Sequence, residues 1–492
     1  MESRPTVSRS LPAGEDAVAT DVAFAPYAVL DEPLLSFDPM DAAQRHVSPL
    51  SGLLTHGPFS VRNWPEDSAR VRVAMLAPAS DLSRLRQLLN EIHLPQQPSE
   101  RRDYLPAYPG FKRAFRCAIV AADAAAQLSL DPRLDSQLEI SAEPHRVLVA
   151  ALTDSLRKLQ SVRSLFDVVV FYLPERWGQA FVAGDFDLHD VVKAQAAQLG
   201  LPTQLITDDA IDYHCRASVA WRLGQALYAK GGGTPYKLAT ASGLLDPDSA
   251  FIGLAYATRT REDGATTFTV CASQIFDAAG GGMDFVAFDV SGDVDPRNPL
   301  LTREQMRGVV SASLSVYADR SSGHRPRRLV IHKLLPFTDA EVAGCADAWG
   351  GLDGLECISL TRSSWFGVEL VSNVSGPRWG YAVRRGTLLP LDDFTRLLWI
   401  GGNAPSATLS RSSNYFQAGK GIPHPITMTR WAGSGDLTQA AAEVLALSKV
   451  DWNNDALYGS LPVTVKYAQV LARVVKHVPT LPAIPFDYRL FM

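Results

Sequence analysis

The chain has 492 residues, of which 46% are hydrophobic and 20% are charged, so it can bury more than one core. From this length we expect roughly two to four domains. The net charge of -5 argues against a protein that coats nucleic acid through its whole surface, because that mode depends on a large positive field. Any nucleic-acid site must therefore be local.

Residues 1–25 are polar and follow no hydrophobic pattern, which predicts a flexible leader. They contain four acids and no continuous apolar stretch, which argues against a secretory signal. No apolar run approaches the roughly 18 residues of a membrane helix, so we expect a cytoplasmic protein without a membrane partner. The five cysteines include no C-x-x-C pair, so neither disulfides nor structural zinc are expected.

Residues 26–240 alternate between short β-branched runs and helical stretches. The predicted strands are RVRVAMLA, FDVVVFYL and PTQLIT, and the predicted helices are DLSRLRQLLNEI, LHDVVKAQAAQLG and DYHCRASVAWRLGQALYAK. Strands and helices in alternation favour a parallel sheet covered by helices. We therefore predict an α/β domain here, and KLATASGLLDPDSA is predicted to connect it to a second unit.

Residues 241–492 begin with three predicted strands, SAFIGLAYATR, TTFTVCASQIF and MDFVAFDV. The turns between them are typical of an antiparallel meander. The helix TREQMRGVVSASLSVYADR follows, then the strand RRLVIHKLL, the helix TDAEVAGCADAW and strands around ECISLTR, GYAVRR and TRLLWI. Two helices come last, the second being PVTVKYAQVLARVVKHV with one apolar face. This order predicts an RNase H-like fold.

Five segments resemble, in order and in spacing, the MID and PIWI domains of Argonaute proteins. They are GLPTQLI, ALYAKGGGTPYKL, SAFIGLAYATR, LVIHK and DWNNDALYGSLPVTVKYAQVLA. Upstream, SPLSGLLTHGPFS and DYLPAYPGF look like the start of the short prokaryotic branch, which lacks the N and PAZ domains. The resemblance implies an N-terminal segment and a Rossmann-like MID domain over residues 26–240, followed by an RNase H-like PIWI domain over residues 241–492.

In this family the MID domain holds the 5'-phosphate of a guide strand, and the resemblance places His189, Lys193, Gln204 and Lys230 at the binding positions. The residue types themselves, apart from the family resemblance, suit the binding of an anion. Asp187 is a plausible N-cap, so His189 would lie in a first helical turn, where free N–H groups and the helix dipole favour an anion. Lys193 lies one turn later on the same face, and its ammonium would give charge-assisted hydrogen bonds.

Each of these residues also has a simpler interpretation. His189 and Lys193 are what the solvated side of an amphipathic helix would carry, and Lys230 suits the last turn of a helix before Gly231. The three glycines from Gly231 to Gly233 lack the G-K-[ST] context of a phosphate loop. The ordered set of four residues favours the phosphate site.

Argonautes also tuck their last apolar residues between the MID and PIWI domains. The segment FDYRLFM is apolar enough to do so. The resemblance implies that the carboxylate of Met492 helps to bind a Mg²⁺ ion at the guide phosphate. A docked terminus without a metal is the alternative.

Three positions bear on nucleic-acid cleavage. RNase H-like nucleases hold two magnesium ions with carboxylates, and the ions stabilise the attacking and leaving oxygens. At the positions of these ligands in active Argonautes, this chain has Ala255 after I-G-L, Leu334 after H-K, and Gln469 in the helix KYAQVLA. None of the three can replace a carboxylate for a hard cation. We therefore predict a PIWI domain without catalytic residues, without a catalytic cofactor and without nuclease activity.

A protein that binds a guide but cannot cut still recognises sequence, because base pairing supplies the specificity. The resemblance implies a prokaryotic defence system in which a guide RNA pairs with single-stranded target DNA and activates a partner protein with an APAZ domain. A sirtuin-like effector on that partner is expected ahead of a TIR or nuclease domain, and it would deplete the cell of NAD. Candidate contacts to the guide–target duplex are Lys237, Arg259, Lys333 and Lys466.

Two other hypotheses stay open. The chain could be a guide-directed nuclease with an unconventional metal site. Metal-dependent cutting that is abolished by mutation of one acidic residue would favour this hypothesis. It could also be an RNase H-like assembly module without a guide, which the absence of co-purifying short nucleic acid would favour.

Overall fold

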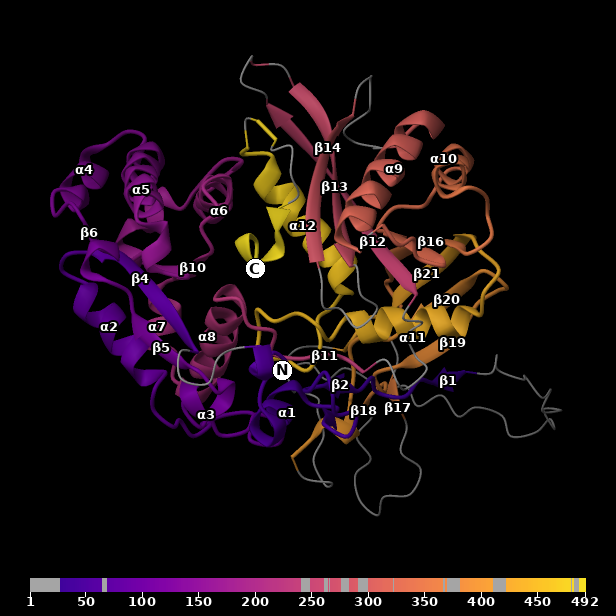
Figure 1. The fold of residues 1–492 in the computed structure, drawn as a ribbon, viewed down its shortest axis with the longest axis horizontal. Coiled ribbons are helices and arrows are strands. Elements are labelled where there is room, and N and C mark those ends of the chain that lie inside the picture. The colour runs from indigo at the N-terminus through magenta and orange to yellow at the C-terminus, as the bar shows by residue number, and fades with distance from the viewer. Residues whose placement is uncertain are drawn as a thin grey trace, which may run out of the picture.

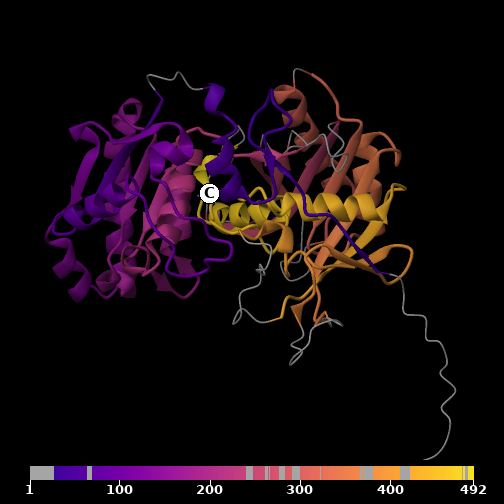
Figure 2. The ribbon, with the colours of Figure 1, turned by 90° about the horizontal axis from the view of Figure 1, so that it is seen from below.

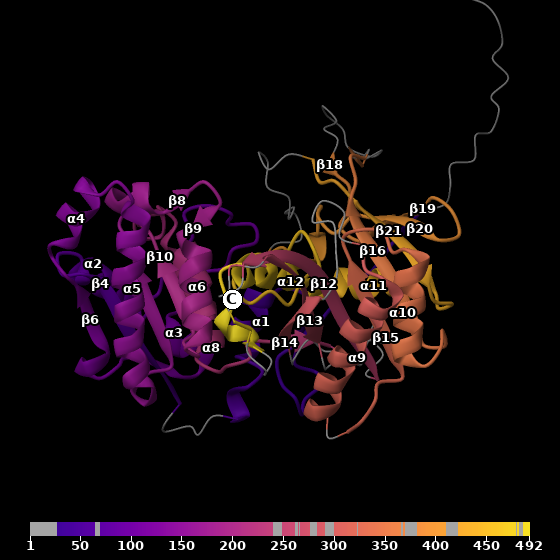
Figure 3. The same cartoon turned by 90° about the horizontal axis from the view of Figure 1, so that it is seen from above.

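The structure, a computed structural model, consists of two halves that follow each other in the sequence (Figure 1). Each half is built on its own sheet, and the last residues of the chain lie between the halves in all three views (Figure 1, Figure 2 and Figure 3). The structure describes residues 27–63, 69–239, 248–260, 264, 266–275, 283–290, 300–321, 323–365, 368–369, 381–409, 422–478, 480–481 and 486–492.

The first half contains a sheet of five parallel strands. Their order is β10 (Thr203–Ile206), β7 (Val168–Tyr172), β4 (Arg70–Pro78) and β5 (Ala118–Ala121), and β6 (Gln127–Leu130) pairs with the second part of β4. In β7, Val168, Val170 and Tyr172 belong to one core, whereas Val169 and Phe171 belong to another. A strand buried on both faces has a continuous apolar sequence, which is why this strand was predictable.

Helices cover both faces of this sheet, as the alternation of elements predicted. One face packs against α2 (Leu82–Glu91), α3 (Phe111–Phe115), α7 (Asp208–Asp212) and α8 (Arg216–Lys230). The other face packs against α4 (Leu134–Ile140) and α5 (Pro144–Ser161). Helix α6 (Leu188–Gln198) contributes side chains to both cores. The predicted helix over residues 212–230 begins later than expected, because α7 precedes it.

The second half contains a mixed sheet of ten strands. Their order is β1 (Ala28–Val29), β19 (Thr387–Pro390), β20 (Thr395–Leu398), β21 (Ile426–Ala432), β16 (Leu355–Arg362), β15 (Arg328–Lys333), β12 (Ser249–Thr260), β13 (Thr266–Ile275), β14 (Met283–Val290) and β22 (Phe486–Asp487). Strands β12, β13 and β14 form the predicted antiparallel meander, and β12, β15 and β16 are parallel. The predicted strand GYAVRR is reduced to β18 (Tyr381–Ala382), which pairs with β17 (Val368–Glu369) outside this sheet.

Two pairs of helices sandwich the ten-stranded sheet. Ile252 and Leu254 face α9 (Arg303–Arg320) and α10 (Asp339–Trp349), whereas Phe251 faces α11 (Leu437–Leu447) and α12 (Val463–Val475). The core under α11 and α12 is continuous with a core of the first half. Gly253 allows α12 to approach β12, since a Cβ there would lie 2.2 Å from the carbonyl of Thr464.

The segment before the first large sheet also contacts the second half. Strand β1 pairs with β19, and β2 (Leu35–Ser36) pairs with β3 (Arg45–His46) and with β11 (Lys237–Leu238). The carboxylate of Glu32 accepts hydrogen bonds from Arg385 at 2.9 Å and from Lys449 at 2.7 Å. Residues 27–63, which the sequence grouped with the first domain, thus connect the two halves.

The remaining elements are short. They are α1 (Pro49–His56), the pair β8 (Val182–Ala183) and β9 (Phe186–Asp187), and the 3-10 helices η1 (Val61–Asn63), η2 (Ala124–Ala126), η3 (Arg163–Leu165), η4 (Glu175–Ala180), η6 (Pro405–Ala407) and η7 (Tyr488–Leu490). Within the described ranges, no helix has both the length and the apolar composition needed to cross a membrane.

Candidate nucleic-acid interface

Helix α6 begins with a side-chain cap. The Asp187 carboxylate accepts hydrogen bonds from the main-chain N–H groups of His189, at 2.8 Å, and Asp190, at 3.4 Å. The predicted N-cap is confirmed, and His189 lies in the first turn. Lys193 follows one turn later, where its side chain is buried, whereas half of the His189 side chain is exposed.

Two buried ammonium groups meet beside strand β10. Lys193 Nζ donates to the main-chain oxygens of Thr203 and Met492, both at 2.7 Å. Lys230 Nζ, from the last turn of α8, donates to Gln204 Oε1. The structure therefore brings together three of the four predicted phosphate-binding residues, from α6, β10 and α8. We call Lys193, Gln204, Lys230 and Met492 the lysine pocket.

Burial destabilises the charge of both lysines. It lowers the pKa of Lys193 to about 7. It lowers the pKa of Lys230 well below its usual value, and the nearby charge of Lys193 lowers it further. Among the described residues, no ion pair joins either lysine to a side-chain carboxylate. Two desolvated ammonium groups that repel each other form a site that an added anion would stabilise.

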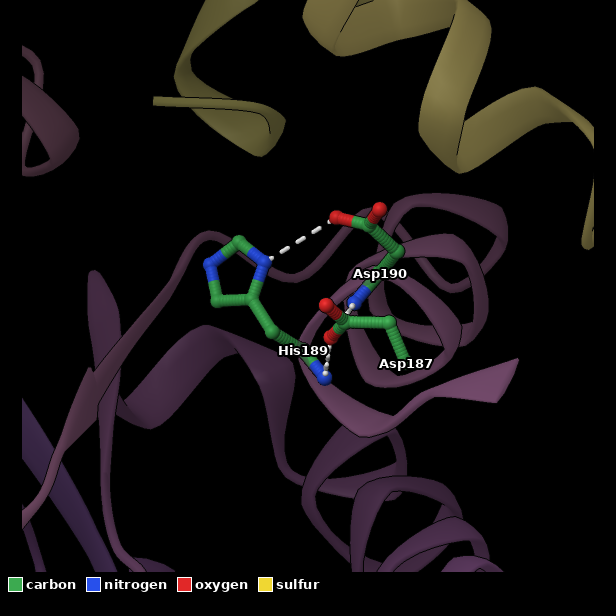
Figure 4. Close-up of side chains that lie close together, drawn as sticks. All are labelled: Asp187, His189 and Asp190. Carbon is green, nitrogen blue, oxygen red and sulfur yellow. Dashed lines mark hydrogen bonds and ion pairs between the residues drawn. The ribbon is translucent and has the colours of Figure 1, made fainter. Parts of the chain in front are cut away.

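His189 contacts acids rather than the lysine pocket. Its Nδ1 lies 3.2 Å from Asp190 Oδ1, with the Asp187 carboxylate nearby (Figure 4). Burial opposes ionisation of Asp190, but the hydrogen bond with His189 and the charge of Arg473 outweigh it and lower the pKa of Asp190. Within the described residues, no contact joins His189 to the lysine pocket, and the adjacent carboxylates would repel a phosphate.

The same three side chains are close enough together to ligate a metal ion, since their ligand atoms lie within 4.8 Å of one another. Both acids already have partners, however. Asp187 caps α6, and Asp190 Oδ2 lies 3.4 Å from Nε of Arg473 on α12. The group is therefore explained by the cap and by the contact between α6 and α12.

A cavity of about 610 Å³ opens beside Gln204, between β10, α7 and α8. Its polar lining includes Arg222 from α8 and Asn453 from the loop before α12, so both halves contribute to it. Sequence reasoning missed both residues. Arg222 has the appearance of an exposed helix residue, and only its position beside Gln204 in the fold distinguishes it.

Ala255, Leu334 and Gln469 line a single second cavity of about 670 Å³. The strand register explains how they meet. Leu254 of β12 lies beside Lys333, the last residue of β15, in a parallel pair, so the residues that follow them, Ala255 and Leu334, lie close together beside the end of β15. Gln469 reaches the cavity from α12, which packs on β12.

Three cationic side chains line this second cavity, which we call the cationic cavity. Arg362 comes from the end of β16, and Arg473 and Lys476 come from α12 and its C-cap. Gln469, Arg473 and Lys476 are four and then three residues apart, so they lie on one helix face. None of the described lining residues is an aspartate or a glutamate. Sequence reasoning followed the apolar face of this helix and missed the cationic one.

Two of the four residues predicted to contact a duplex are buried partners of acids. Lys333 Nζ is fully buried and donates to Glu341 Oε1 at 2.6 Å. Arg259, whose side chain is 2% exposed, pairs with Asp289 and donates to the carbonyl of Val478 at 3.1 Å. Side chains held in this way do not reach a duplex, so the prediction is corrected for both.

The other two predicted duplex residues are partly exposed. Lys237 Nζ lies 5.2 Å from the ring centre of Phe59. Lys466 pairs with Asp451, and its side chain is 36% exposed. Their contact with a duplex stays a prediction.

The lysine pocket suits an anion better than Mg²⁺. Lys193 contacts the main-chain oxygen of Thr203 and one oxygen of Met492, whose carboxylate is the predicted Mg²⁺ ligand, and Gln204 Oε1 accepts from Lys230. Mg²⁺ is usually held by carboxylates, phosphates and water, and the adjacent ammonium groups would repel it. The lysine pocket would offer Mg²⁺ only the Met492 carboxylate beside two lysines, so its charge favours an anion, and the Mg²⁺ ion that the resemblance implied stays a prediction.

Comparisons of sequence and of fold give different results. No family model and no curated protein matches the sequence. The fold is similar to that of Clostridium butyricum Argonaute bound to a guide DNA and a 19-mer target DNA, with a TM-score of 0.65 and 14% identity over 96% of this chain and 55% of that one.

Two further structures are similar at comparable levels. Aa-Ago with externally bound siRNA has a TM-score of 0.61 and 16% identity, and Drosophila Piwi has a TM-score of 0.58 and 14% identity. Each likeness covers 94% of this chain and 56% of the other, so the chain spans little more than half of their length. At these identities the likeness is one of fold. The chain has the mixed α/β fold of the MID and PIWI domains of Argonaute proteins.

Proposed function

We propose that this chain binds the 5'-phosphate of a guide strand in the lysine pocket and pairs that guide with a target strand. The observation that carries the proposal is the meeting of two buried ammonium groups, Lys193 and Lys230, with no side-chain acid beside them among the described residues. A phosphate would add negative charge beside these two lysines and form charge-assisted hydrogen bonds with them. The fold supports the proposal, since a similar structure is an Argonaute bound to guide and target DNA.

The chain is proposed to sense the target rather than cut it. Ala255, Leu334 and Gln469 line one cavity, and the lining residues that the structure describes include no carboxylate for a metal pair. Binding alone does not act on a target. The resemblance to short prokaryotic Argonautes supports a heterodimer with an APAZ-domain effector, sirtuin-like ahead of TIR or nuclease, that degrades NAD when a guide RNA pairs with invading single-stranded DNA.

The first experiment purifies the chain with its partner and end-labels the co-purifying nucleic acid. We compare wild type with Lys193→Met plus Lys230→Met, which keeps side-chain volume but removes both ammonium groups. Lys158→Met, at an exposed position of α5, is the matched control. Short 5'-phosphorylated strands should be present in wild type and the control and lost in the double variant. If wild type carries none, the guide role is wrong and the assembly role is favoured.

A cleavage assay tests the nuclease alternative. Guide-loaded protein is incubated with labelled target in Mg²⁺ and in Mn²⁺, and we expect intact target. If cutting occurs, Asp190→Asn decides whether the group around His189 supplies the metal site, because that group is the candidate cluster of ligands in the described part of the chain.

A further inference from the structure

We propose that the cationic cavity binds a backbone phosphate of the guide–target duplex, with Arg362, Arg473 and Lys476 in the place where a nuclease would hold metal ions. The inference rests on the proposed function, because it assigns a second phosphate site to the same complex. The ligand class is a nucleic-acid phosphodiester.

The three cations reach one cavity from two elements. Arg362 is exposed at the end of β16 and forms no ion pair with any residue that the structure describes. The Arg473 side chain is 58% exposed, and Lys476 Nζ lies 3.4 Å from the main-chain oxygen of Asp185. Positive charge here is therefore largely unneutralised by neighbouring side chains.

One acid touches this set from outside the cavity. Asp190 of α6 lies 3.4 Å from Arg473, and it does not line the cavity. The pair fixes Arg473 at the contact between the two halves but leaves Arg362 and Lys476 without a carboxylate partner among the described residues. The cavity wall thus carries three cations, and the acid that contacts one of them lies outside the cavity, which favours an anionic ligand.

The remaining lining suits a phosphate better than a metal. Ala255 and Leu334 offer no ligand atom, and Gln469 offers an amide that can donate to a phosphate oxygen. Arginine presents several N–H groups in a plane, so it can contact a phosphate in a bidentate manner. A volume of about 670 Å³ lies in the usual range of ligand pockets and accommodates a nucleotide unit.

The expected size of the effect follows from counterion release. Each phosphate contact adds about 0.7 to 0.9 to the slope of log affinity against log salt. Three contacts therefore contribute about 2 to 3 to this slope. Near 0.15 M salt each contact raises affinity about fivefold, and the three together raise it about a hundredfold.

The test measures guide affinity and target affinity separately, each across a salt series. The charge-removing variant combines Arg362→Gln, Arg473→Gln and Lys476→Gln, and these positions are exposed or half-buried, so the fold should tolerate them. Gln469→Glu keeps the shape of the side chain and adds one negative charge to the cavity. Lys158→Gln, remote on α5, controls for net charge.

We expect the triple variant to load a 5'-phosphorylated guide like wild type, to bind target about a hundredfold more weakly, and to lose about 2 to 3 from the salt slope. Gln469→Glu should weaken target binding in metal-free buffer, whereas Lys158→Gln should not. If guide affinity falls instead of target affinity, the bound phosphate belongs to the guide strand and the site still stands.

Two outcomes would overturn the inference. If the triple variant loads guide normally and shows unchanged target affinity and salt slope, the cationic cavity does not bind a phosphate, and the proposed function is unaffected. Equal weakening by Asp190→Asn, which breaks the contact with Arg473 but keeps every cation, would show that the cations act by joining the two halves. Absence of any guide in wild type would instead contradict the proposed function itself.

Discussion

Binding of a guide phosphate in the lysine pocket should take up protons. In the unloaded chain burial lowers the pKa of Lys193 to about 7, so at pH 8 only about a tenth of this side chain is charged. A phosphate restores the charge, so the complex holds more protons than the free chain. Affinity must then fall as pH rises above 7, by up to about tenfold per pH unit for each proton taken up. Lys230, with its pKa also lowered by burial, adds to this uptake.

The assay compares dissociation constants of 5'-phosphate and 5'-hydroxyl guides between pH 6 and 9. We expect the phosphate guide to bind best between about pH 6 and 7, because the second pKa of a phosphate monoester is about 6. The hydroxyl guide should show little pH dependence, and Lys193→Met should flatten the profile of the phosphate guide. Calorimetry in buffers of different ionisation heat measures the protons directly. A phosphate-guide affinity that is constant from pH 7 to 9 would refute the reasoning.

Four further outcomes are expected. The pKa of Lys193 is lower in the folded chain than in the unfolded one, so the free energy of unfolding of the unloaded chain should rise from pH 7 to about pH 10.5. Lys193→Met should reduce this rise, as measured by denaturant unfolding at each pH. Lys333→Met should destabilise the fold by about 3 to 5 kcal/mol by leaving Glu341 buried without its partner, with no change in salt slope once the protein is folded. Glu32→Gln should lower the melting temperature by several degrees and increase proteolysis of residues 27–63, because it weakens the ion pairs of residue 32 with Arg385 and Lys449. Chelation with EDTA should leave the bound guide in place. Release of the guide by EDTA would instead support the predicted Mg²⁺ ion in the lysine pocket.

Local signals in the sequence identified much of the fold, and the family resemblance identified three residues of the lysine pocket. Strand β7 is a continuous apolar run, and the cap at Asp187 is a local pattern, so neither depends on distant contacts. Lys193, Gln204 and Lys230 were named from the resemblance, and the fold brings them together. His189 has the right spacing, but its partner Asp190 is adjacent in sequence and competes for its side chain.

The errors come from contacts that no local pattern records. Lys333 is the last residue of a central strand, and its partner Glu341 lies on the next helix, so its burial is visible only in three dimensions. The first strands are two residues long and carry no periodicity, and Glu32 meets its cationic partner Arg385 from the far end of the chain. Arg362 and Arg473 are ordinary surface residues in sequence, and the sheet register brings them to one cavity.

A net charge of -5 and two cationic sites are compatible because the sites act at contact distance. Interactions between exposed charges fade beyond about 8 Å at physiological salt, so a negative surface neither attracts nor strongly repels a distant strand. Lys193 and Lys230 are buried, where screening is weak and an ammonium gains most from a phosphate that fits. Such a protein gains little from a strand that merely touches its surface, and this difference would allow it to select 5'-phosphorylated guides from other nucleic acids.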